Sequence, residues 1–328
     1  MSIESIAAKC QRMLKPLPCY VLNRKPLIII SYWHDFLNAR IFFLKRLGNY
    51  KSAHLLFQLG WHRETDERVQ GIKAEIDKLN TEHTGLNFTF LCNSTTEEEL
   101  FKKYSLHSIF CHQNAFLDEN RYRIIKDVQK KYDAIYIARI TPFKRHELAS
   151  SIKSLHLIGD YFEREQDHYK KIMHILNQTS WVRKVSASKI YKEINSARVG
   201  LCLSAEEGAM FVSAEYFLCG IPVVNTDNIG GRDFLFPDNC FAQVNPTPQD
   251  VTAGVKRMAQ SKINPESIRT AIISKMQQHR KPLITLLQEI VDKNNVDYNI
   301  KDNWKRIFIH KLGLRSGVPI WIRITRSF

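Results

Sequence analysis

The chain has 328 residues, of which 44% are hydrophobic and 25% are charged. This length exceeds what most single cores reach, and it favours two domains of roughly 100–200 residues each. The composition is that of an ordinary globular protein and excludes a largely disordered one. The longest apolar runs, such as 27–30 and 199–203, fall far short of the roughly 20 residues of a membrane-spanning helix.

A formal net charge of +15 favours anionic partners, which include nucleic acid, an anionic membrane and phosphorylated small molecules. Nucleic acid is the weaker option, because the sequence has no RNP, helix-turn-helix or zinc-finger pattern. Seven cysteines lie singly without a C-x-x-C pair, which is typical of small buried side chains in a reducing compartment. No secretory signal pattern opens the chain, so we expect a cytoplasmic protein.

The first half of the chain alternates short apolar runs with amphipathic stretches, the pattern of βα units around a parallel sheet. The clearest helices are 64–79 and 96–104, and the second follows the capping residues Asn93 to Thr95. The expected strands are 27–31, 54–59, 87–91 and 109–111.

A second βα series begins at Asp133, where "AIYIARI" reads as a strand buried on both faces. Further strands are expected at 154–158, 182–185, 199–204 and 221–225. Helices are expected at 167–176, 188–196, 210–218, from 248 or 249 to 260, and at 265–292. The polar, irregular segment between the two series connects two such domains.

The stretch "LSAEEGAMFVSAEYFLCGIPVV" carries the most information about chemistry. With Glu207 in a loop and Glu215 on the following helix, their carboxylates lie at most about 12 Å apart, within reach of one sugar nucleotide. The helix N-terminus between them, at Ala209, Met210 and Phe211, suits a diphosphate.

This stretch resembles the donor-binding E-x7-E segment of retaining family-4 glycosyltransferases of the GT-B type. That segment usually reads S-x-x-E-G-x-G-x-x-x-x-E-A and is followed by G-x-P-V-V. The residues that match it are Ser204, Glu207, Gly208, Glu215, Gly220, Pro222, Val223 and Val224. The family's second loop glycine is Met210 here.

Upstream, "YIARITPFKRHELA" resembles the family's G-R-x-x-x-x-K-G segment, with Arg139 at the end of a strand and Lys144 at the start of a helix. Ala138 and Arg145 replace that segment's glycines. The segment 112–122 is similar to the family's P-N-G-V-D connection, and "DNIGGRDFLFPDN" is similar to its G-G-x-x-E turn.

The resemblance implies two Rossmann-like domains with parallel sheets facing across a cleft. It divides the chain into an acceptor domain over 1–113, a connection over 114–131, a donor domain over 132–293 and a basic tail over 294–328. The implied reaction transfers a sugar, with retention, from a nucleoside-diphosphate sugar to a glycan or lipid-linked acceptor.

The resemblance also assigns roles to the matched residues. Arg139 and Lys144 hold the diphosphate, Glu207 the sugar hydroxyls and Glu215 the ribose. Ser204, Gly208 and the helix N–H groups complete the donor site. Because the chain has no D-x-D, we expect no metal and no other cofactor. The alternative for each charged residue is an ordinary solvated position, and for Ser204 and Gly230-Gly231 an ordinary turn.

The first domain lacks the family's glycine-rich loop; Tyr32-Trp33-His34-Asp35 follows the strand instead. His34 is the candidate for the family's donor-contacting histidine, with His62 the weaker one and a structural role the alternative for both. The missing loop supports a second possibility, a catalytically inactive protein that binds sugar nucleotides or glycans.

The segment from Lys301 to the C-terminus combines seven cations with Trp304, Phe308, Trp321 and alternating isoleucines. Such a mixture could rest on an anionic membrane, which predicts peripheral attachment at the inner face. Alternatively, the segment packs back onto the first domain.

Overall fold

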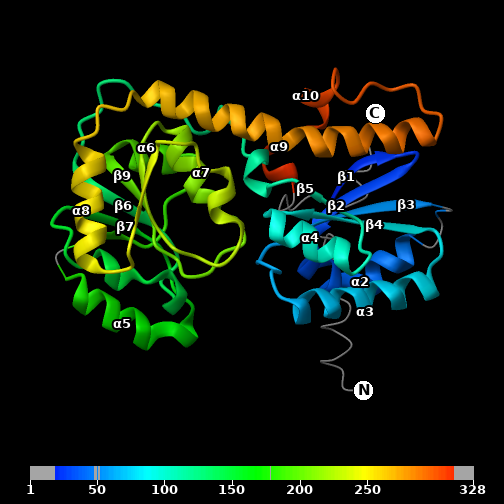
Figure 1. The fold of residues 1–328 in the computed structure, drawn as a ribbon, viewed down its shortest axis with the longest axis horizontal. Coiled ribbons are helices and arrows are strands. Elements are labelled where there is room, and N and C mark those ends of the chain that lie inside the picture. Colours follow the sequence, from blue (N-terminus) through cyan, green and yellow to red (C-terminus); the bar gives the residue numbers. More distant parts are fainter. Residues whose placement is uncertain (1–18, 48–49, 51, 178, 314–328) are drawn as a thin grey trace. The chain divides into compact units, whose positions relative to one another are not determined.

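The computed structural model describes residues 19–313 except 48–49, 51 and 178, and it contains two compact units. Unit 1 combines the chain up to Phe116 with the chain from His279 on, and unit 2 comprises Leu117–Gln278. Each unit has a mainly parallel sheet covered by helices (Figure 1). The predicted α/β class with two Rossmann-like domains is therefore confirmed.

The sheet of unit 1 has five strands in the order β1-β2-β3-β4-β5. They are β1 (Cys19–Arg24), β2 (Leu27–Tyr32), β3 (Ala53–Gln58), β4 (Leu86–Cys92) and β5 (Ser108–Phe110). Strands β2 to β5 are parallel and lie near their predicted positions, whereas β1 pairs antiparallel with β2 and was not predicted.

Because the four parallel strands follow one another across the sheet, right-handed crossovers place all their helices on one face. These helices are α2 (Trp33–Leu47), α3 (Asp66–Glu82) and α4 (Thr95–Lys103). The core between them and the sheet contains Trp33, Phe36, Phe57 and Phe90, whose rings pack against one another. Ser94 caps α4 as expected, since its Oγ accepts a hydrogen bond from the Glu97 backbone N–H at 3.0 Å.

The other face of this sheet is covered by the C-terminal part of the chain (Figure 1). Helix α9 (Pro265–Lys293) presents Leu283, Leu287 and Val291 to that face, and Ile307 and Leu312 complete the core. The chain leaves unit 1 after η1 (Gln113–Phe116). It returns to unit 1 with the second part of α9, followed by α10 (Trp304–Ile307) and η6 (His310–Gly313). The units thus divide α9, whereas the predicted domain boundary lay after it.

Two aromatic residues of the predicted tail, Trp304 and Phe308, pack within unit 1. Trp304 stacks on Phe308 with ring centroids 5.9 Å apart, and it lies 6.4 Å from the ring of Phe116. The Arg280 guanidinium lies over the Phe308 ring at 4.7 Å. This packing is the alternative that the sequence left open for Trp304 and Phe308; residues 320–324 lie outside the described residues.

Unit 2 contains a six-stranded, fully parallel sheet in the order β11-β10-β9-β6-β7-β8. Its strands are β6 (Tyr132–Ile137), β7 (Leu155–Ile158), β8 (Ser180–Val182), β9 (Ala197–Cys202), β10 (Val223–Thr226) and β11 (Phe241–Val244). The strand order reverses between β6 and β9, which makes this pair the switch point of the sheet.

Helices cover both faces of this sheet. They are α5 (Gln166–Ile175), α6 (Ile190–Asn195), α7 (Phe211–Leu218) and α8 (Pro248–Ala259), with the short turns η3 (His146–Ala149), η4 (Glu163–Glu165) and η5 (Gly231–Leu235). Helix α8 packs against η3 and strands β6, β9, β10 and β11. Gly200 on β9 allows Tyr216 of α7 to approach, since an added Cβ would lie 2.4 Å from that ring.

Two further predictions concern the cysteines and the absence of a membrane-spanning helix. The six cysteines among the described residues are free and buried, as expected of small core side chains. A search of the described helices for a long, apolar segment able to cross a membrane finds none.

Candidate functional site

The matched residues gather at the carboxyl edge of the unit 2 sheet, next to its switch point. The loop after β6 carries Arg139 and Lys144, and the loop after β9 carries Ser204 and Glu207. Open parallel sheets bind ligands at this position, because the loops on either side of the reversal diverge and leave room.

Lys144 and Glu207 form a buried ion pair between Nζ and Oε1, with side chains 13% and 8% exposed. The Ser204 hydroxyl donates to the same Oε1 at 2.7 Å. On the other side of the pair, the Tyr136 hydroxyl donates to the Lys144 carbonyl at 2.6 Å and fixes its backbone. The structure therefore brings together Lys144, Ser204 and Glu207, as the sequence predicted.

The predicted helix after β6 is wrong. Lys144 ends a short 3-10 turn, η2 (Pro142–Lys144), and a second 3-10 turn, η3, follows. Arg145 separates the two turns with a left-handed backbone, φ 50° and ψ 48°, so no continuous helix forms.

Arg139 is exposed at the end of the strand, and its guanidinium stacks over the Phe162 ring at 4.0 Å. Phe162 lies in the loop after β7 and is 41% exposed. Stacking leaves the guanidinium N–H groups in its plane available to an anion.

The loop from Glu207 to α7 is buried. Gly208, Ala209 and Met210 are all inaccessible or nearly so, and α7 begins at Phe211, one residue after the predicted start. Met210 has φ 48°, in the left-handed region that favours glycine. The residue that replaces the family's glycine thus keeps a glycine-like backbone.

Glu215 lies on α7, as expected, and is 7% exposed. It accepts a hydrogen bond from the Tyr122 hydroxyl at 2.8 Å. Burial, followed by the nearby Glu215 carboxylate, raises the pKa of Tyr122. The hydroxyl therefore stays protonated and acts as the donor.

Two arginines that sequence reasoning missed hold the loops in place. Arg145 donates to the Leu203 carbonyl at 2.6 Å, to Thr226 Oγ1 at 2.8 Å and to the Asp227 carbonyl at 2.8 Å. It thereby ties the loop after β6 to those after β9 and β10. Its pKa is lowered by burial and by the neighbouring guanidinium of Arg232.

Arg232 is fully buried, and it donates to the carbonyls of Ser204, at 2.9 Å, and of Thr226. Asp233 balances its charge, with Oδ1 2.6 Å from Arg232 Nε. The sequence did offer a signal for these residues, since Arg145 stands where a glycine is usual and Arg232 follows Gly230-Gly231 in the matched turn.

The candidate histidines belong to unit 1. His34 is exposed in the first turn of α2, and its Nε2 lies 2.9 Å from the Asn38 amide nitrogen. His62 is buried after β3, with its Nε2 2.8 Å from the Arg68 guanidinium. Both follow carboxyl ends of strands, and contact of His34 with a donor stays a prediction.

No cluster of three or more His, Cys, Asp or Glu side chains suited to a metal ion occurs among the described residues.

Comparisons with known proteins identify the fold. No protein-family model matches the sequence, and no curated protein sequence matches it either. Solved structures do match. Anabaena HepE in complex with UDP has a TM-score of 0.55 at 16% identity, covering 78% of this chain and 74% of HepE. Sucrose-phosphate synthase from Thermosynechococcus elongatus has a TM-score of 0.57 at 14% identity, covering 81% of this chain and 73% of the synthase. The chain has the GT-B fold.

A third match within this fold is a variant of S. aureus TarM, solved with fondaparinux, alpha-GlcNAc-glycerol and UDP. Its TM-score is 0.54 at 16% identity, and the match covers 86% of this chain but 55% of TarM. HepE has also been solved with UDP-glucose. At these identities the likeness shows the GT-B fold alone.

Proposed function

We propose that this chain is a metal-independent glycosyltransferase. It moves a sugar from a nucleoside-diphosphate sugar to a glycan or lipid-linked acceptor and retains the anomeric configuration. The observation that carries this proposal is the buried Lys144–Glu207 pair with Ser204 at the switch point of unit 2. The fold supports it, because the matched proteins include HepE with UDP-glucose.

The diphosphate of the donor lies against Lys144 and Arg139 in this proposal. Lys144 has three N–H donors, so it can contact a phosphate oxygen while it remains beside Glu207. Glu207 accepts hydrogen bonds from the sugar hydroxyls. Glu215, which accepts a hydrogen bond from Tyr122, is proposed to accept from the ribose hydroxyls.

In the transfer step, the bond between the sugar C1 and the phosphate oxygen breaks, and its electron pair leaves with the nucleoside diphosphate. The acceptor oxygen forms the new bond to C1 on the same face, and its proton passes to the departing phosphate oxygen. The protein supplies fixed positive charge where the leaving group gains negative charge. Neither a metal ion nor a protein base is required, and transfer is expected to persist in excess EDTA.

A direct test compares Lys144→Ala and Glu207→Gln in a transfer assay with a panel of sugar nucleotides. Loss of one partner of a buried charge pair typically costs about 2–5 kcal/mol, so kcat/KM should fall tens- to thousands-fold. The matched controls are Lys171→Ala and Glu163→Gln, two exposed residues of the same unit. Activity of both site variants within about threefold of the controls would refute the assignment.

A second candidate is a catalytically inactive protein that binds sugar nucleotides or glycans. The observation in its favour is that β2 ends at Tyr32 and α2 begins at Trp33, with no loop between them. Turnover of any donor by the wild-type protein, abolished in Lys144→Ala, eliminates this candidate. Binding of a donor without transfer or hydrolysis supports it.

Attachment to an anionic membrane belongs to the same proposal, with the protein at the inner face. Lys301, Lys305 and Arg306 are exposed around α10. Each such cation contributes about 1 kcal/mol near an anionic surface. Co-sedimentation with phosphatidylserine vesicles at low salt should fall when all three are changed to Glu. Equal sedimentation of both proteins would refute attachment through this segment.

A further inference from the structure

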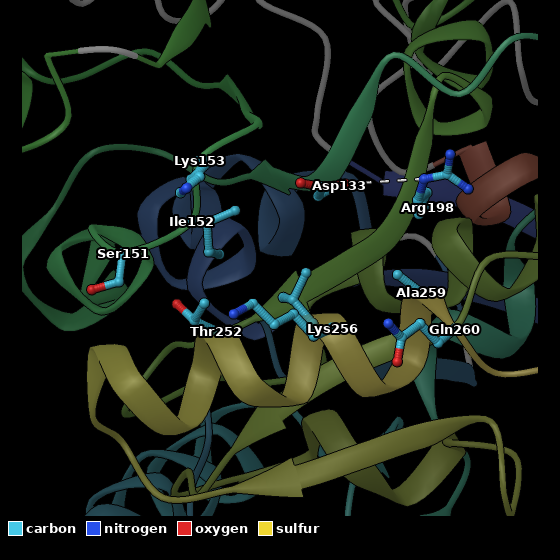
Figure 2. Close-up of a pocket in the computed structure, with 10 residues that line it drawn as sticks. Asp133, Ser151, Ile152, Lys153, Arg198, Thr252, Lys256, Ala259 and Gln260 are labelled. Atoms are coloured by element: carbon cyan, nitrogen blue, oxygen red, sulfur yellow. Dashed lines mark ion pairs between the residues drawn. The ribbon is translucent and has the colours of Figure 1, made fainter.

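A pocket of unit 2 lies at the amino edge of its sheet (Figure 2). Its volume is about 340 Å³, at the lower end of the range for small-molecule sites. Helix α8 forms one side, and the loop after η3 forms the opposite side. Its lining includes Asp133, Ile152, Lys153, Arg198, Val255 and Lys256.

This pocket is separate from the site at the carboxyl edge. Asp133 lies at the beginning of β6 and Arg198 at the beginning of β9, whereas Arg139 and Ser204 follow the ends of the same two strands. A strand rises about 3.3 Å per residue, so six residues place the two sites roughly 20 Å apart. A ligand of one site cannot reach the other.

Cations dominate the pocket. Lys153 comes from the loop after η3, Arg198 from β9 and Lys256 from α8, against one carboxylate, Asp133. Asp133 neutralises Arg198 only loosely, since the ion pair measures 4.0 Å and both side chains are about half exposed, 50% and 49%. Among the described residues, neither Lys153 nor Lys256 forms an ion pair.

The rest of the lining is an apolar wall. Ile152 and Val255 are buried side chains that line the pocket. The pocket therefore combines positive charge with apolar contact.

We propose that this pocket binds a small phosphate monoester with an apolar substituent. Lys153 and Lys256 contact the phosphate, and the substituent packs on Ile152 and Val255. The two lysines and Arg198 outnumber the single carboxylate, which favours a ligand of charge near −2. The inference is independent of the proposed transfer reaction, because it uses none of the residues of that site.

Isothermal titration with phenyl phosphate at low salt tests the proposal on the full chain. Ligand concentrations up to ~5 mM detect a Kd near ~1 mM. The combined variant Lys153→Glu, Lys256→Glu should bind at least about tenfold more weakly. The combined variant Lys170→Glu, Lys171→Glu, the same charge change on exposed residues of α5, should bind like the wild type. All four lysines are exposed, so the variants should keep the wild-type circular dichroism spectrum.

Two further arms separate the possible causes. Inorganic phosphate should bind more weakly than phenyl phosphate, since it lacks the apolar contact. Phenyl phosphate should bind equally in the presence of saturating UDP and in Lys144→Ala. Competition with UDP, equal affinity of the Lys153→Glu, Lys256→Glu variant and the wild type, or no binding of phenyl phosphate by the folded wild type would each overturn the proposal.

Discussion

At Arg145, three hydrogen bonds stabilise the fold whereas the left-handed backbone destabilises it, so two substitutions of this residue should differ in stability. Changing it to Ala removes three hydrogen bonds, to the Leu203 carbonyl, Thr226 Oγ1 and the Asp227 carbonyl. Hydrogen bonds from a charged donor contribute about 1.5–3 kcal/mol each in general. Because Arg145 is half-exposed and lies near Arg232, we take a total of about 3 kcal/mol for all three.

Changing Arg145 to Gly removes the same hydrogen bonds but relieves the left-handed backbone at φ 50°. That conformation costs a residue with a Cβ about 1 kcal/mol more than glycine. The Gly variant should therefore be more stable than the Ala variant by about 1 kcal/mol. For a unit of this size each kcal/mol corresponds to roughly 2–4 °C in Tm.

Thermal unfolding followed by circular dichroism measures both effects. We expect Arg145→Ala to lower the Tm of the unit 2 transition by roughly 6–12 °C, and Arg145→Gly to lower it by about 3 °C less. Arg139→Ala is the matched control, since this exposed arginine only stacks on Phe162, and it should change Tm by about 2 °C at most. A Gly variant less stable than the Ala variant, or an Ala variant equal to the control, would refute the reasoning.

Three other variants test separate parts of the structure. Gly200→Ala places a Cβ 2.4 Å from the buried Tyr216 ring, so it should destabilise unit 2 by about 1–3 kcal/mol in urea unfolding, and an unchanged midpoint would contradict this packing. Burial raises the pKa of Glu97 from 4.5 to about 7 in the folded protein, so its contribution to stability is present at low pH and is lost as pH rises from about 4.5 through 7. The free energy of unfolding of the wild type should fall by about 3 kcal/mol over that pH window relative to that of Glu97→Gln. Parallel plots of unfolding free energy against pH for the two proteins would contradict this expectation. Tyr122→Phe removes the hydrogen bond to Glu215 and should weaken UDP binding a few-fold at unchanged fold, whereas an identical affinity would remove Tyr122 from the site.

The positions of the matched serine and glutamates in the fold were predictable because their pattern is local. Ser204, Glu207 and Glu215 lie within one strand-loop-helix segment, and the periodicity of that segment places one glutamate in the loop and the other on α7. Lys144 meets Glu207 although 63 residues separate them. The parallel sheet explains this meeting, because the loops after β6 and β9 leave its carboxyl edge side by side.

The backbone around Lys144 and Met210 was not predictable from the same pattern. Replacing a glycine usually changes a turn, yet Arg145 and Met210 both keep positive φ. For Arg145, the hydrogen bonds to the neighbouring loops offset the strain, and these bonds depend on tertiary structure that no short sequence window contains. The left-handed backbone of the same residue prevents the continuous helix that the sequence predicts after β6.

The C-terminal part of the chain covers the second face of the unit 1 sheet for a topological reason, and the sequence predicted this packing only as one of two alternatives for the tail. A sheet whose parallel strands follow in sequence order receives all its helices on one face, so its other face needs cover from elsewhere in the chain. Leu283, Leu287, Ile307 and Leu312 supply that cover. The edge of this sheet at β2 is extended by β1, which pairs antiparallel with β2.

The central claim is that unit 2 holds a nucleoside-diphosphate sugar at Lys144 and Glu207. Isothermal titration of the full chain with a panel of nucleoside diphosphates and their glucose conjugates, UDP and UDP-glucose first, tests it most directly. The account predicts one site per chain for at least one nucleotide, with affinity lowered about tenfold or more in Lys144→Ala and unchanged in Lys171→Ala. Binding of no nucleotide by the folded wild-type protein, or equal affinity of the two variants, would contradict it.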